Sequence, residues 1–226
     1  GTLDHVFTLA HEMGHALHSY YSDSNQSYIN AGYKIFVAEV ASTCNESLLI
    51  HYLLKNTDNK AEKAYLINHF LEQFKGTLYR QTMFAEFEKI THKMVEEGET
   101  LTSDILCKVY YDLNKQYFGE DMVLDEEIAL EWARIPHFYN PFYVYQYATG
   151  ISAAIALSKK IMEQGEAGVK DYMKFLTGGG SKDPIDLLKL AGVDMTTKEP
   201  IEKALELFKE LLDQMEQSFL FIDTNA

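Results

Sequence analysis

The sequence predicts an all-α fold with little or no sheet. Apolar residues recur at the three- and four-residue spacing of a helix face through most of the 226 residues. Helix start and stop signals bound these stretches, such as Thr102 before one apolar segment and Gly192 after another. We expect one domain over residues 1–226, because there is no internal repeat, low-complexity segment or obvious linker.

The composition argues against two classes of partner. The net charge of −14 argues against nucleic acid, whose phosphates require clustered Lys and Arg side chains. No apolar run is long enough to span a bilayer, and no secretory signal segment is present, so we expect no membrane partner. Only Cys44 and Cys107 occur, both inside helix-like runs, which predicts a reducing compartment, the cytoplasm.

The first predicted helix, residues 6–20, contains the pattern HEMGH at residues 11–15. His11 and His15 are one helical turn apart on the same face, so their imidazoles can bind one metal ion. Zinc suits two neutral histidines, and Glu12 between them suits a general base. The alternative is an amphipathic helix whose histidines face solvent or cap the core. We expect the helix to be buried because much of it is apolar: Leu9, Ala10, Met13, Ala16 and Leu17.

A catalytic zinc site requires a third protein ligand. Glu39 is the best candidate, because it is a lone charge in an apolar run of the next predicted helix, which extends from after Gly32 to about Leu54. The alternative is that Glu39 points to solvent. Glu46 follows two turns later on the same face, as a carboxylate that orients a ligating histidine or as a surface charge.

Helices and turns alternate through the middle of the chain. Residues 22–27 read as a polar loop and residues 56–60 as a turn. A long helix is predicted over residues 61–97, another over 102–117, and Asp125 caps a short helix. The long helix carries an apolar stripe typical of a core: Leu66, Phe70, Phe74, Leu78, Phe84 and Phe87.

Helical packing does not explain residues 134–150, which are rich in tyrosine. Two prolines disfavour a helix before Phe142, so His137 and Tyr139 are expected on a loop or extended segment. One interpretation is an aromatic core cluster with satisfied hydroxyls. The other is a catalytic segment, in which His137 and a tyrosine donate hydrogen bonds to the oxyanion of the transition state. We favour Tyr145 for this role, with Tyr139 second, and we expect Tyr139 to contact the substrate.

The remaining segments provide support. Helices are predicted over residues 151–164, 169–177, 184–190 and 200–221. The glycines at 178–180 favour a flexible turn over a phosphate cradle, because no Lys-Ser/Thr signature follows them. The last helix places five apolar residues on one face, which we expect to pack on the bundle: Ile201, Leu205, Phe208, Leu212 and Met215.

The sequence resembles the oligoendopeptidase F group of thimet-type zinc oligopeptidases over nearly the whole chain. The motifs are HEMGHALHS (11–19), FVAEVAS (36–42), IPHFY (135–139), YVYQYATG (143–150), FLTGGGS (175–181) and LAGVDM (190–195). The resemblance implies a helical zincin-like catalytic domain in which His11, His15 and Glu39 bind zinc. It implies a contribution from a His and a Tyr near residues 137–145, without selecting the Tyr. It also implies short oligopeptide substrates and an N-terminal portion of the same enzyme as partner, this chain being the C-terminal part.

The resulting expectation is a zinc metalloendopeptidase that hydrolyses internal bonds of oligopeptides, with Glu12 as general base. Two alternatives stay open. One is a zinc carboxypeptidase of related fold. The other is a non-catalytic helical assembly fragment in which zinc is structural or absent.

Overall fold

The computed structural model describes the backbone of residues 1–223 and the side chains of residues 1–218. It is 79% helical with no strand in the described part, which confirms the all-α prediction. The chain divides into two compact units: unit 1 comprises Gly1–Phe74 and the chain from Thr149 onward, and unit 2 comprises Lys75–Ala148. A single domain over residues 1–226 stays a prediction. Within the described residues, no helix is both long and apolar enough to cross a membrane.

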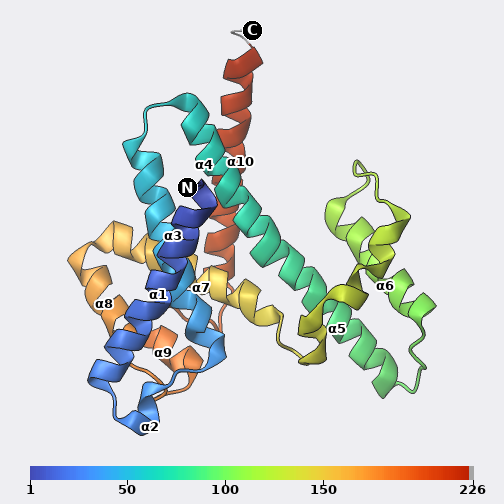
Figure 1. Ribbon diagram of the computed structural model, residues 1–226, viewed down its shortest axis with the longest axis horizontal. Helices are drawn as coiled ribbons and strands as arrows, with labels where there is room; N and C mark the ends of the chain where they lie inside the picture. The colour runs from blue at the N-terminus through green and yellow to red at the C-terminus, as the bar shows by residue number, and fades with distance from the viewer. Residues whose placement is uncertain (224–226) are drawn as a thin grey trace. The chain divides into compact units, whose positions relative to one another are not determined.

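Unit 1 is a bundle of helices, in which α1 runs alongside α3 (Figure 1). Its elements are α1 (Leu3–Asn25), α2 (Tyr28–Ala31), α3 (Ile35–Asn56), α4 (Lys60–Gln73), most of α7 (Tyr145–Gln164), α8 (Glu166–Leu176), α9 (Pro184–Leu190) and α10 (Glu199–Asp223). All residues of α7 from Gly150 to Ser158 are buried, so other parts of the protein cover this segment on all sides. The main core cluster joins α3, α7, α8 and α9 through residues such as Val40, Cys44, Ala154, Leu157, Phe175 and Leu188.

Unit 2 packs around a second, aromatic core. Its elements are most of the π-helix η1 (Phe74–Tyr79), α5 (Arg80–Glu96), α6 (Ser103–Phe118), the 3-10 helices η2 (Glu126–Arg134) and η3 (Pro136–Tyr139), and the start of α7. The first residue of η1, Phe74, belongs to unit 1. Glu131 of η2 accepts hydrogen bonds from Arg80 of α5 and Tyr110 of α6, both at 2.6 Å. The largely buried carboxylate therefore joins three elements of the unit.

The long helix predicted over residues 61–97 is confirmed as the continuous run α4, η1 and α5, interrupted only by the π-helical turn. Gly98 follows it with a φ of +85°, a conformation that ends a helix and favours glycine. The predicted apolar stripe is buried throughout: Leu66, Phe70, Phe74, Leu78, Phe84 and Phe87.

Two predicted loops are largely helical instead. Helix α1 continues to Asn25, so the polar loop predicted at residues 22–27 is confirmed only at Gln26 and Ser27. The hydroxyl of buried Ser22 donates to the carbonyl of Ala31, so the helix accommodates this polar residue. His137 and Tyr139 lie in the 3-10 helix η3, because a single turn that begins with a proline needs no donor at that position.

The expected burial of the first helix is also wrong. Helix α1 buries one face, which includes Phe7, Gly14 and His18. Its opposite face carries an apolar stripe, 40–65% exposed, which we call the outer stripe: Val6, Leu9, Met13, Leu17 and Tyr20. Apolar content alone did not show which side of α1 the rest of the chain covers.

Helix α10 is rotated relative to the prediction. Ile201, Leu205 and Leu212 are 39–42% exposed, whereas Ala204 and Leu211 are buried. Phe208 does pack inward, and its ring lies 5.4 Å from that of Phe74. The small side chain of Ala204 allows this face of α10 to approach the bundle closely.

The contact between α1 and α3 is tightest at Gly14. A Cβ atom on Gly14 would lie 2.5 Å from the Cα of Ser42 and 2.8 Å from the carbonyl oxygen of Ala41. One turn earlier, the Asn45 side-chain amide donates to the carbonyl of Ala10 at 2.6 Å. The two backbones therefore touch at a position where only glycine fits.

Gly14→Ala should lower the free energy of unfolding by about 1 kcal/mol or more, measured by urea unfolding of the chelator-treated chain. Overpacking costs about 1–3 kcal/mol, and a contact with backbone atoms at 2.5 Å places Gly14→Ala at the upper end of that range. Subtracting the roughly 0.5–1 kcal/mol that Ala gains over Gly inside a helix then leaves a net loss of about 2 kcal/mol. Gly32→Ala is the matched control, because Gly32 has a φ of −71° and no atom within 4 Å of the added Cβ. Equal stability of the two variants would contradict the close approach.

Candidate metal centre

The two motif histidines face each other along α1. His11 and His15 are separated by one turn, and their ring centroids are 4.8 Å apart at an interplanar angle of 82°. Their Nε2 atoms are 3.1 Å apart. Both side chains are partly buried, at 29% and 27% exposure, so solvent or a ligand can reach them.

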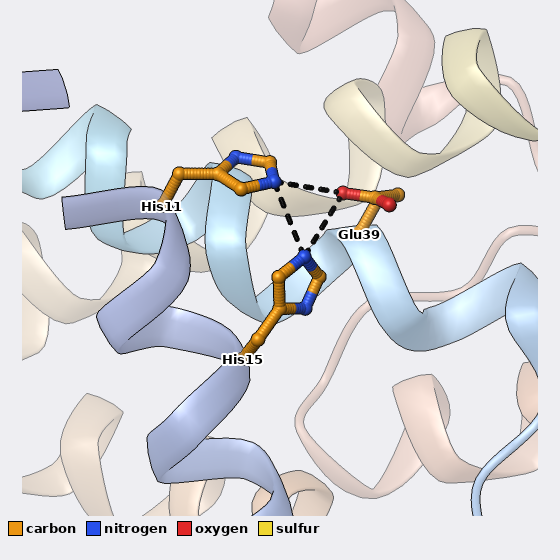
Figure 2. A group of neighbouring side chains, drawn as sticks. All are labelled: His11, His15 and Glu39. Atoms are coloured by element: carbon orange, nitrogen blue, oxygen red, sulfur yellow. Dashed lines mark hydrogen bonds and ion pairs between the residues drawn. The ribbon is translucent and has the colours of Figure 1, made fainter. Parts of the chain in front are cut away.

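Glu39 completes the group from α3. Its Oε2 lies 3.2 Å from Nε2 of His11 and 3.4 Å from Nε2 of His15. Figure 2 shows the carboxylate directed at both rings. Val40 and Ala41, the next residues of α3, are buried in the core, which leaves Glu39 on the side that faces α1. The alternative that Glu39 points away into solvent does not describe this geometry.

The three candidate ligand atoms have the spacing of a tetrahedral zinc site. Zinc–ligand bonds of about 2.0–2.1 Å place neighbouring ligand atoms about 3.3 Å apart in a tetrahedron. The observed separations of 3.1, 3.2 and 3.4 Å agree with that spacing. Among the residues that the structure describes, His11, His15 and Glu39 are the only three His, Cys, Asp or Glu side chains so grouped. The set of two imidazoles and one carboxylate fits zinc and leaves a coordination position for water.

Hydrogen bonds from neighbouring side chains orient both His11 and Glu39. His11 Nδ1 lies 2.7 Å from Oε1 of Glu46, so an Nδ1–H donates to the carboxylate and leaves Nε2 free to bind a cation. The other carboxylate oxygen, Oε2, accepts from the side-chain amide of Gln73 at 2.9 Å. The hydroxyl of buried Ser42 donates to Oε2 of Glu39 at 3.1 Å.

The electrostatics of the group favour a positive charge at His11. Hydrogen bonding to Glu39, and then to Glu46, raises the pKa of His11 to about 10. The same hydrogen bond from His11 lowers the pKa of Glu39. The negative charges of Glu39 and Glu46 that favour a proton at His11 would equally favour a divalent cation bound between His11, His15 and Glu39.

Glu12 follows His11 on α1, and its side chain is exposed. A carboxylate in that place is accessible to water and substrate. It is one residue away from a group that can bind a cation.

The other predicted residues belong to unit 2. His137 Nε2 lies 3.3 Å from the hydroxyl of Tyr147, and the His137 ring stacks on Tyr143 with centroids 5.6 Å apart. Tyr139 is 85% exposed and Tyr145 42% exposed. Within its unit, His137 is therefore joined to a tyrosine that the sequence analysis did not select.

Sequence reasoning also missed Gln73 and Ser42 as partners of the acidic side chains. Gln73 is 27 residues from Glu46, and no periodic pattern links them. Ser42 was visible as a small polar residue one turn after Glu39, which is the spacing at which its hydroxyl reaches back.

Comparisons with known proteins agree with the motifs. The pattern of Peptidase family M3 matches residues 2–207. The chain is 57% identical to Oligopeptidase PepF of Bacillus subtilis over 95% of its own length and 32% of that protein. It is 45% identical to the chromosomal Oligoendopeptidase F of Lactococcus lactis subsp. cremoris, over 96% of its length and 36% of that protein.

A solved structure shows the same fold. The crystal structure of oligoendopeptidase-F from Enterococcus faecium superposes with a TM-score of 0.86 at 46% identity, over 96% of this chain and 39% of that one. The chain thus spans about a third of the length of the relatives it matches. The family match covers both histidines, Glu12 and Glu39, and the chain belongs to Peptidase family M3.

Proposed function

We propose that this chain is the zinc-binding catalytic portion of an oligoendopeptidase. The observation that supports this most directly is the mutual spacing of His11 Nε2, His15 Nε2 and Glu39 Oε2, which fits one tetrahedral cation. When bound, zinc supplies a Lewis acid and a water of lowered pKa. The chain's own residues supply the cation site, the proton transfer and the orientation of the ligands.

Glu12 is the proposed general base. Its exposed carboxylate takes a proton from the attacking water and passes it to the amine that leaves when the peptide bond breaks. This assignment relies on its place next to His11. A glutamate adjacent to a metal-binding histidine on one helix suits proton transfer rather than coordination.

His137 and Tyr145 are proposed as hydrogen-bond donors to the oxyanion, and Tyr139 as a substrate contact. The support is chemical: unit 2 presents an imidazole and several phenols on the segment that extends from η3 into the first residues of α7. The hydrogen bond between His137 and Tyr147 makes Tyr147 a further donor candidate in that segment.

The proposed substrates are short peptides cleaved at internal bonds. The names Oligopeptidase PepF and Oligoendopeptidase F of the relatives support this class. A carboxypeptidase would instead require a free C-terminus. Cleavage of a quenched peptide with an amidated C-terminus therefore separates the two activities.

The proposed partner is the N-terminal portion of the same enzyme. The relatives are about three times as long as this chain, and the outer stripe of α1 leaves five apolar side chains exposed. Contiguous apolar surface of this kind marks an interaction site. The proposed location is the cytoplasm, supported by the two cysteines, Cys44 and Cys107, which are free thiols.

Glu12→Gln should retain one equivalent of zinc and reduce peptide turnover about 10²- to 10⁴-fold, because it removes the base without removing a ligand. Elemental analysis after gel filtration and a quenched-peptide assay measure the two effects. Asp23→Asn, which neutralises an exposed carboxylate near the C-terminal end of α1, is the control and should change neither. A Glu12→Gln chain with the wild-type rate would contradict the mechanism.

His15→Ala should lose both zinc and turnover in the same two measurements, because it removes a proposed ligand.

Zinc should raise the thermal stability of the chelator-treated chain. A ligand that binds only the folded state raises the free energy of unfolding by about 2.7 kcal/mol at a concentration of 100 times its Kd. Glu39→Ala should abolish most of this shift in a thermal melt, whereas Glu206→Ala, at an exposed position of α10, should keep it. A zinc-dependent shift that survives Glu39→Ala in full would exclude Glu39 as a ligand.

A further inference from the structure

Gln73 connects the candidate metal centre to a third helix. It is the last residue of α4, and its side-chain amide donates to Oε2 of Glu46 at 2.9 Å. Oε1 of the same carboxylate lies 2.7 Å from Nδ1 of His11. The three side chains form one hydrogen-bonded series, Gln73 to Glu46 to His11, which ends at Nδ1 of a ring whose other nitrogen, Nε2, faces Glu39.

Gln73 is followed directly by a π-helical turn whose first side chain is buried. The next residue, Phe74, begins the π-helical turn η1, and its side chain is fully buried. The Phe74 ring lies 5.4 Å from both Phe70 and Phe208. A π-helical turn shifts the register of the residues that follow and is frequently found at functional sites. The buried ring thus anchors the helix next to Gln73.

The chemistry of glutamine suits this place. Glu46 is only 15% exposed, and an ionised carboxylate in such a position needs a donor at each oxygen. The glutamine amide is a neutral donor, so it holds one oxygen without neutralising the carboxylate. The negative charge of Glu46 then acts on His11, where it fixes the ring and its tautomer. A lysine or arginine at position 73 would compete with His11 for that charge.

We propose that Gln73 is a positioning residue of the metal centre, which acts by orienting Glu46 and, through Glu46, the imidazole of His11. The inference rests on the proposed function, since it assumes that His11 binds zinc. Loss of the amide lets the Glu46 carboxylate rotate, and His11 then loses part of its orientation. Substitution of such an outer hydrogen-bond partner lowers metal affinity about 10- to 100-fold when the contact to the ligand is direct.

Gln73→Met removes the donor and keeps the length of the side chain, and Gln73→Glu replaces the donor by an acceptor. Zinc affinity is measured for both by competition with a chromophoric chelator. The affinity should fall about threefold to tenfold for Gln73→Met and further for Gln73→Glu, where two carboxylates face each other. Gln26→Met is the matched control, because Gln26 donates a comparable hydrogen bond, at 2.7 Å to the carbonyl of Thr177, away from the centre.

A double-mutant cycle with Glu46→Ala tests whether Gln73 acts through Glu46. In the Glu46→Ala background, Gln73→Met should change zinc affinity less than twofold, because the group that it orients is absent. A general loss of helix packing would instead lower affinity equally in both backgrounds. That additive result, or wild-type affinity in both Gln73 variants, would overturn the inference.

Zinc binding by the wild-type chain distinguishes a failure of the Gln73 proposal from a failure of the proposed function. Tight binding of one zinc that is lost in His15→Ala, together with unchanged affinity in the Gln73 variants, overturns only the role of Gln73. Failure of the wild-type chain to bind zinc overturns both. Thermal melts of Gln73→Met and Gln26→Met should show similar stabilities, so that a difference in zinc affinity reports on the centre.

Discussion

The close approach of α1 and α3 at Gly14 is the constraint on which the candidate metal centre depends. Because no side chain separates Gly14 from Ser42, the backbones touch there. His11 lies about one turn before Gly14 on α1 and His15 directly follows it, and Glu39 is one turn before Ser42 on α3. The contact therefore places a carboxylate within 3.4 Å of both imidazoles. A larger residue at position 14 would push α1 away from α3 and so separate the two histidines from Glu39, although none of the three is itself changed.

The charges of the centre complement a cation. Glu39 and Glu46 contact His11 from its two ring nitrogens, and both act to raise the pKa of the ring. Their combined charge matches that of a divalent ion, while Ser42 and Gln73 donate to them without adding charge. Partly buried carboxylates without such donors would destabilise the fold. The same hydrogen bonds thus satisfy the acidic side chains and orient the ligand atoms.

Local patterns predicted the helices and which side chains come together in the candidate metal centre, but not their surroundings. The one-turn spacing of His11 and His15 and the lone charge of Glu39 are visible in the sequence, because each is a property of a single helix. Which side of α1 is covered depends on other helices, so the exposure of the outer stripe, like the rotation of α10, could not be predicted from apolar spacing. The contact of Gln73 with Glu46 joins two helices and depends on tertiary packing, for which the sequence carries no periodic signal.

The centre lies wholly within unit 1, so its coordination can be tested in this chain independently of turnover. Zinc K-edge X-ray absorption of the chain loaded with one equivalent is the most direct measurement. Coordination by His11, His15 and Glu39 predicts a four-coordinate shell of nitrogen and oxygen at about 2.0–2.2 Å, with the scattering signature of two imidazoles. It further predicts one oxygen fewer from protein in Glu39→Ala. A shell of water oxygens without imidazole scattering, or one containing thiolate, would contradict the assignment of His11, His15 and Glu39.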